Sequence, residues 1–245
     1  MHSLVQQCTR IAHAEVIMSA VSETKGFDSA AAITRSMLGW GVVAGPFYLV
    51  FGLILALTRP GFDLTRDALS LLLLGSAGWL QALNLILAGA MTLVAAVGLA
   101  RTPRWSRAAA VLVGVYGLCL VLSAIFPPDA TAYFPPGAAG GVFTVHGLLH
   151  LVFGGIGFLA LGIASILAAR WHRRQSARGS AWSIVAGVVV IVGFVGGGAL
   201  SQGPAGVALL WIAVLAGWGW LAWTSVVAYR AVPHPVIAQR QQQVA

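Results

Sequence analysis

Charged side chains are scarce in this chain of 245 residues: they make up 8% of it, and only six residues are Asp or Glu. A soluble domain carries about 25% charged residues. The hydrophobic share of 59% would give a soluble fold a surface too apolar for water. A bilayer accepts such a chain, because a helix satisfies its backbone hydrogen bonds internally. The shortage of charge therefore excludes a soluble globular domain.

Six long runs contain no Asp, Glu, Lys or Arg, and each is close to the roughly 20 residues that cross the hydrocarbon core as a helix. The runs are Ser36–Leu57, Leu80–Ala100, Ala108–Phe126, Thr144–Ala169, Ala181–Leu200 and Ala205–Tyr229. The sequence predicts an all-α bundle of six transmembrane helices over residues 36–230, with tails at 1–35 and 231–245. Ion-coupled transport is disfavoured, because it needs charged groups at depth.

Cysteine is also rare, since only Cys8 and Cys119 are present. Cys8 falls in the predicted N-terminal tail and Cys119 in the outer half of the third run. The two thiols differ in predicted depth, so no structural disulfide is expected.

The net charge of +8 follows the predicted topology. Twelve of the 14 basic residues lie in four segments: before the first run, between the second and third runs, between the fourth and fifth runs, and after the sixth run. Cytoplasmic loops carry the excess of Lys and Arg. We therefore expect a cell-membrane protein with both termini in the cytoplasm. Orientation and anionic lipid headgroups account for the basic segments, so nucleic acid is not an expected partner.

The first gap on the outer side predicts a short helix. Pro60-Gly61 is a turn signal, and Asp63 is a suitable N-cap for the residues that follow. The stretch Asp63–Gly75 would form about three turns, too few to span the bilayer. We expect a non-spanning helix at the outer interface, between the first two spans.

The second outer gap brings an acid close to two histidines. Pro-Pro pairs stiffen residues 126–137 and place Asp129 just beyond the third run. His146 and His150 form a His-x-x-x-His pair, one turn apart on one helix face. We expect the Asp129 carboxylate to lie beside His146, directly or through a water molecule.

Three interpretations of Asp129, His146 and His150 remain open. They can transfer protons as catalytic groups, because polar side chains within a membrane are functional candidates by default. They can bind a divalent metal, which is not favoured, since zinc takes at least three protein ligands and the other histidines lie in predicted cytoplasmic segments. They can also serve structure, through hydrogen bonds to neighbouring helices. The sequence specifies no cofactor.

The outer-gap motifs occur in a fixed order. They are Thr58-Arg-Pro-Gly-Phe-Asp63, Leu69-Ser-Leu-Leu-Leu-Leu-Gly75, Gly78-Trp-Leu-Gln81 with Asn84, Phe126-Pro-x-Asp129, Tyr133-x-Pro-Pro-Gly137 and His146-Gly-x-Leu-His150. From about Thr34 to Tyr229 the chain resembles the bacterial membrane family catalogued as domain of unknown function 998. The resemblance implies a six-span bacterial membrane protein without an assigned activity. Members of that family tend to have an Asp after the second histidine, where this chain has Leu151, and this difference weakens a metal interpretation.

Three functional hypotheses from different classes follow. The first is an enzyme that acts on a membrane-dissolved lipid or isoprenoid-like amphiphile through Asp129, His146 and His150 at the outer leaflet. The second is a non-catalytic membrane accessory or sensor protein, and the third is a facilitator of small-molecule export. A convergence of the three side chains on a cavity open to lipid or to the outer aqueous side would favour the first.

Overall fold

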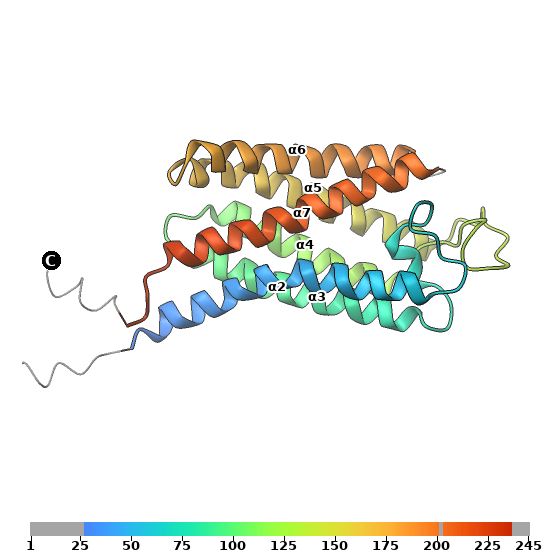
Figure 1. The fold of residues 1–245 in the computed structure, drawn as a ribbon, viewed down its shortest axis with the longest axis horizontal. Coiled ribbons are helices and arrows are strands. Elements are labelled where there is room, and N and C mark those ends of the chain that lie inside the picture. Colours follow the sequence, from blue (N-terminus) through green and yellow to red (C-terminus); the bar gives the residue numbers. More distant parts are fainter. Residues whose placement is uncertain (1–26, 201–202, 237–245) are drawn as a thin grey trace, which may run out of the picture. The chain divides into compact units, whose positions relative to one another are not determined.

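The computed structural model describes residues 27–200 and 203–236, and all regular secondary structure in these ranges is helical (Figure 1). The elements are α2 (Ser29–Thr58), the short 3-10 helix η1 (Leu69–Leu73), α3 (Gly78–Ala100), α4 (Arg107–Ile125), α5 (Val145–Arg173), α6 (Ala177–Ala199) and α7 (Pro204–Ala231). The six α-helices of the described ranges are long and apolar enough to cross a membrane. The prediction of a six-helix, multi-pass membrane protein is confirmed.

The helix ends extend beyond several of the predicted runs. The helix α2 begins at Ser29, earlier than the predicted Ser36. Asp28 is its start signal, since the Asp28 carboxylate accepts the Ala31 N–H at 2.9 Å. The predicted tails, 1–35 and 231–245, otherwise fall largely outside the described residues.

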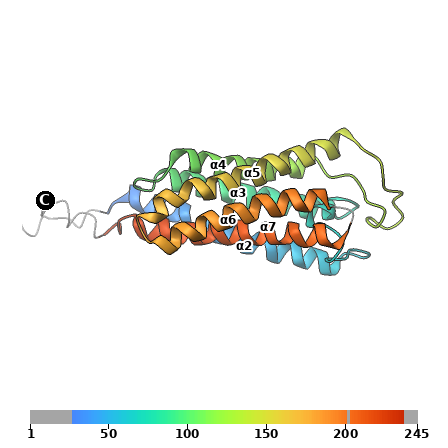
Figure 2. The same cartoon turned by 90° about the horizontal axis from the view of Figure 1, so that it is seen from above.

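Successive helices run in opposite directions within the unit formed by residues 34–232 (Figures 1 and 2). The α3–α4 and α5–α6 turns lie at one end of this unit, called the arginine end because Arg101, Arg104, Arg173 and Arg174 lie there. Segments 59–77 and 126–144 lie at the opposite end, called the loop end.

Glycines let the helices approach at backbone distance. A Cβ added to Gly187 of α6 would lie 2.5 Å from the Gly162 carbonyl oxygen of α5, and the reverse distance would be 3.0 Å. Gly89 of α3 and Gly117 of α4 face each other in the same way. A Cβ added to Gly89 would lie 2.6 Å from the Gly117 carbonyl oxygen, and the reverse distance would be 2.9 Å. Close packing of this kind holds helices together in lipid, where no hydrophobic force acts between them.

Buried polar side chains add hydrogen bonds between helices. The Trp220 indole N–H donates to the Ser183 hydroxyl at 2.8 Å, and that hydroxyl donates to the Ser165 carbonyl at 2.8 Å. These two bonds connect α7, α6 and α5. On the other side of the bundle, Asn84 Nδ2 donates to the Tyr48 carbonyl at 3.1 Å, which connects α3 to α2.

The predicted three-turn helix over Asp63–Gly75 is wrong. The Asp67 carboxylate folds back and accepts the Asp63 N–H at 2.9 Å, with Asp67 only 1% exposed. The Asp63 carboxylate accepts the N–H and the hydroxyl of Thr65, and these bonds lower the pKa of Asp63. Side-chain bonds of this type compete with helical ones. The turn therefore closes at Asp67, Ala68 is extended, and only η1 follows.

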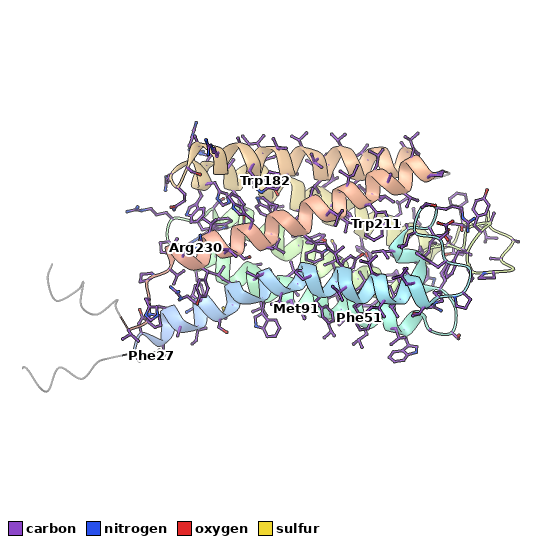
Figure 3. The ribbon with its side chains drawn as sticks, viewed as in Figure 1. Phe27, Phe51, Met91, Trp182, Trp211 and Arg230 are labelled. Carbon is purple, nitrogen blue, oxygen red and sulfur yellow. The ribbon has the colours of Figure 1, made fainter. Side chains whose placement is uncertain are left out.

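The segment after α2 is nevertheless fixed to the bundle at several points. The Leu side chains of η1 are buried, and Arg59 donates to the Leu72 carbonyl at 3.1 Å. Trp211, labelled in Figure 3, donates its indole N–H to the Leu64 carbonyl at 3.3 Å. These contacts hold the segment against the loop end of the bundle.

Candidate functional site

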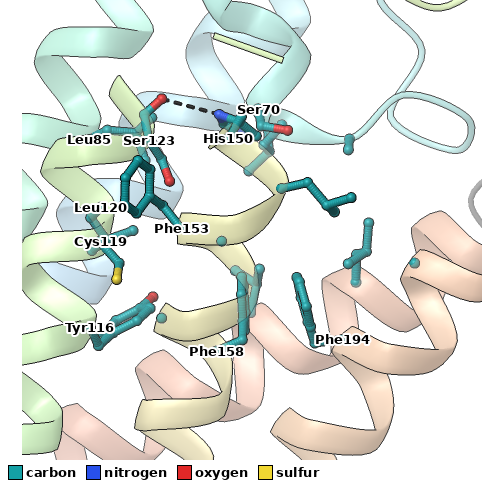
Figure 4. Close-up of a pocket in the computed structure, with 18 of the residues that line it drawn as sticks. Ser70, Leu85, Tyr116, Cys119, Leu120, Ser123, His150, Phe153, Phe158 and Phe194 are labelled. Carbon is teal, nitrogen blue, oxygen red and sulfur yellow. Dashed lines mark hydrogen bonds between the residues drawn. The ribbon is translucent and has the colours of Figure 1, made fainter. Parts of the chain in front are cut away.

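A cavity of about 230 Å³ lies among the helices toward the loop end (Figure 4). All six α-helices of the described ranges and η1 contribute to its wall. Most of the wall is apolar or aromatic, and none of the described residues that line it is Asp, Glu, Lys or Arg. The hydroxyl, thiol and imidazole groups in the wall belong to Tyr48, Ser70, Tyr116, Cys119, Ser123 and His150.

His150 supplies the imidazole, and the end of α4 holds its ring. Its Nδ1 lies 2.8 Å from the Phe126 carbonyl oxygen and 3.2 Å from that of Ser123; Figure 4 draws the second of these. A carbonyl oxygen only accepts, so Nδ1 carries the proton and donates it to these two oxygens. In the neutral imidazole, Nε2 is then the unprotonated nitrogen.

The sequence explains why these carbonyls need a donor. In a continuing helix the Ser123 carbonyl would accept the N–H of the residue four positions later. That residue is Pro127, which has no N–H. His150 therefore replaces a backbone donor that Pro127 removes, and the two residues fix one tautomer of the ring.

The second nitrogen of His150 is available to a ligand. The imidazole lines the cavity while Nδ1 is occupied, and Nε2 has no hydrogen-bond partner within residues 27–200 and 203–236. A nitrogen lone pair at the wall of an apolar cavity can accept a hydrogen bond or a proton.

Three aromatic side chains form the deep end of the cavity. The Trp218 ring centroid lies 5.4 Å from that of Tyr48 and 5.5 Å from that of Tyr116. All three side chains are buried against the bundle. Figure 4 shows Tyr116 at the opposite end of the cavity from His150. The two tyrosine hydroxyls make no hydrogen bond with any other described residue, so both are free to bind a ligand.

The cavity opens sideways between α5 and α6. Leu151, which is 60% exposed, and the exposed Gly198 both line it. A Cβ added to Gly154 or Gly198 would meet no atom within 4 Å. Phe158 and Phe194 stack at 4.7 Å between centroids and limit the opening on its deep side. Figure 2 shows α5 diverging from α6 toward the loop end. Both helices are long and apolar enough to cross a membrane.

Asp129 is part of the helix start and does not line the cavity. Its carboxylate accepts the Thr144 N–H at 3.1 Å and the Thr144 hydroxyl at 2.6 Å. Thr144 is the N-cap of α5, and its hydroxyl accepts the Gly147 N–H at 3.0 Å. A Cβ on Gly147 would overlap the carboxylate. Asp129 therefore fixes the loop to the N-terminus of α5, where a negative charge is favourable.

His146 also lies outside the cavity wall. Its ring centroid is 5.9 Å from that of Phe126. In the described part of the chain, no direct hydrogen bond joins His146 to Asp129, whose oxygens bind Thr144 instead. Of the three predicted site residues, the structure brings only His150 to the cavity. Across the described residues, no group of three or more His, Cys, Asp or Glu could hold a metal ion.

Sequence reasoning missed the tyrosines of the cavity. Tyr48 and Tyr116 lie in the middle of two predicted spans, whereas Tyr229 lies at the end of one. A phenol hydroxyl within the hydrocarbon core needs a polar partner. The mid-span position of these two residues was the available signal.

The Asp129 arrangement gives a testable prediction. Asp129→Ala should lower the free energy of unfolding by about 1 kcal/mol, because Thr144 loses its acceptor at a partly solvated site. Asp129→Asn keeps one acceptor oxygen, so its free energy of unfolding should lie between those of Asp129→Ala and the native chain. Thermal unfolding in detergent measures both. An unchanged stability together with lost activity would instead assign Asp129 a catalytic role.

The fold defines a multi-pass membrane protein whose helices enclose a cavity with no Asp, Glu, Lys or Arg among its described lining residues. The chain belongs to the family described as "Protein of unknown function (DUF998)", whose model matches residues 42–227. The family resemblance of the sequence motifs is therefore confirmed, and the match includes every residue of the cavity wall. No curated protein and no solved structure matches the chain significantly.

Proposed function

We propose that the protein is an enzyme that binds a membrane-dissolved amphiphile in this cavity, with His150 as the general base. One observation carries the proposal: His150 lines the cavity with its Nδ1 bound to two carbonyls, while its Nε2 has no hydrogen-bond partner among the described residues. A histidine base is commonly held in this way, with one nitrogen oriented by an acceptor and the other directed at the substrate. Asp129 and His146 act in this proposal by shaping the loop and the start of α5.

The loop end, and with it the cavity, is proposed to face the outer side of the cell membrane. The arginines of the loop end are both engaged: Arg59 binds the Leu72 carbonyl, and Arg66 lies 3.6 Å from Asp67. The arginine end carries the excess of positive charge that marks cytoplasmic segments. Both termini are then cytoplasmic.

Reporter fusions test this orientation. Fusions after Arg107, Arg178 and Arg240 should give a cytoplasmic signal, because these residues follow the basic segments. A fusion near Ala138 should give an external signal. An external signal after Arg178 would reverse the topology and move the cavity to the inner leaflet.

The deep end of the cavity helps to distinguish the enzyme from the other two hypotheses, the sensor and the export facilitator. Tyr48, Tyr116 and Trp218 close its deep end, which favours an enzyme or a receptor over an export facilitator. A non-catalytic sensor could use the same cavity, since no described lining residue is an acid that could serve as a second proton-transfer group beside His150. Turnover of the ligand distinguishes the two.

The test of the proposed function is a comparison of lipids from a strain lacking the gene with lipids from its parent. One amphiphile class should accumulate and its product should fall, and the native gene should restore both. An unchanged lipid composition, combined with ligand binding to the purified protein, would favour the sensor. An unchanged lipid composition without ligand binding to the purified protein would contradict the proposal.

A further inference from the structure

We propose that the ligand of this cavity is an uncharged, single-chain amphiphile with a hydroxyl headgroup, of the long-chain alcohol class, which enters from the bilayer between α5 and α6. This inference rests on the proposed function and specifies its substrate class. It is carried by the polarity, size and opening of the cavity.

The absence of charge in the wall excludes charged headgroups. Among the described residues that line the cavity there is no Lys or Arg to pair with a phosphate or carboxylate, and no acid to pair with an ammonium. An ion moved from water into an apolar site without a partner pays a large desolvation cost. The nearest arginines along the chain, Arg59 and Arg66, already bind other groups.

The free polar groups of the wall match a hydroxyl. Nε2 of His150 can only accept a hydrogen bond in the fixed tautomer. Ser70 lines the same cavity as His150 (Figure 4), and its hydroxyl has no partner among the other described residues. A ligand hydroxyl can donate to Nε2 and accept from the Ser70 hydroxyl at the same time. A carboxylate or a phosphate diester can accept but cannot donate.

The size and the opening indicate a single chain. The volume of about 230 Å³ lies below the range of roughly 300–1,000 Å³ that holds drug-sized ligands. It can hold a small headgroup and the first part of one chain, but not a two-chain lipid. Gly154 and Gly198 leave the gap through which the rest of the chain would extend among the lipid tails.

Photoreactive probes test the headgroup. The full-length protein in phospholipid nanodiscs would be exposed to diazirine-bearing hexadecanol, palmitate and hexadecyl-trimethylammonium, and the labelled peptides would be located by mass spectrometry. The alcohol should label peptides of α4 and α5 about tenfold more than either ion, and excess hexadecanol should remove the label. His150→Asn should reduce labelling by the alcohol roughly five- to tenfold, the value of one hydrogen bond.

Leucine substitutions test the entrance. Gly154→Leu and Gly198→Leu fit without a clash at Cβ but narrow the gap, and each should reduce alcohol labelling about fivefold. Gly39→Leu is the matched control, because a Cβ at Gly39 also meets no atom within 4 Å and Gly39 does not line the cavity. The control should label like the native protein.

Each contrary outcome has a definite meaning. Stronger labelling of the cavity by palmitate or the ammonium probe would overturn the hydroxyl class and leave the proposed amphiphile site standing. If none of the three probes gave saturable labelling, both the hydroxyl class of ligand and the proposed amphiphile site would be overturned. Unchanged labelling in the Gly154→Leu and Gly198→Leu variants would overturn the entrance between α5 and α6.

Discussion

Replacing His150 with asparagine is expected to lower activity toward the amphiphile at least about a hundredfold while the protein remains folded, since removing a general base typically costs this much. Asn Nδ2 is bonded to Cγ in the same way as the imidazole Nδ1, so it can still donate to the Phe126 and Ser123 carbonyls. Asparagine has no atom at the place of Nε2. The measurement is restoration of the lipid composition in the strain lacking the gene, at matched protein level.

His150→Ala provides the comparison. Alanine removes both nitrogens and leaves the carbonyls at the end of α4 without their donor. It should lower the free energy of unfolding by about 1–3 kcal/mol relative to the asparagine variant. Full activity of His150→Asn would show that Nε2 is not the catalytic group. Equal stability of the two variants would show that the bonds to the α4 carbonyls contribute little.

Gly187→Leu is expected to be among the most destabilising single substitutions in the membrane helices, by about 3 kcal/mol or more. Its Cβ would lie 2.5 Å from the Gly162 carbonyl oxygen and 2.7 Å from Ile166 Cγ1. The contact with a backbone oxygen cannot be relieved by a side-chain rotation, so α5 and α6 must separate. Unfolding in detergent and the yield of folded protein measure the effect.

Gly39→Leu is again the control, since it adds the same side chain where the structure has open space. It should change stability by less than about 0.5 kcal/mol, as surface substitutions do. A Gly187→Leu variant as stable as this control would contradict the close approach of α5 and α6.

The six helices could be predicted because lipid constrains each span independently: charge must be absent, and the backbone must be helical. The first helix boundary was missed because it depends on one local bond, from the Ala31 N–H to Asp28. The segment after α2 was mispredicted for a related reason. Asp63 as an N-cap and the length of the stretch suggested a helix, but the buried Asp67 carboxylate accepts the Asp63 N–H and closes the chain into a single turn.

The candidate site was predictable only in part. The spacing of His146 and His150 placed both on one side of a helix, but the position of α4 decides which ring reaches the cavity. Pro127 predicts a stiff segment, but its missing N–H does not by itself identify His150 as the replacement donor. Asp129 was expected beside His146, directly or through a water molecule; its carboxylate binds Thr144, two residues before His146, and the water-bridged contact stays a prediction. The cavity wall comes from helices distant in sequence, and no local pattern describes it.

The length of α5 has a consequence for the membrane in which the protein works. Its 29 residues extend about 43 Å, whereas the 23 residues of α6 extend about 35 Å and a hydrocarbon core is about 30 Å thick. The surplus of α5 must be accommodated by tilt or by protrusion into the headgroup region. Gly154 lies about nine residues, or roughly 13 Å, from the start of α5. For the proposed entry between α5 and α6, bilayer thickness therefore sets the depth at which the gap meets the acyl chains, and hydrophobic mismatch becomes a control on access to His150.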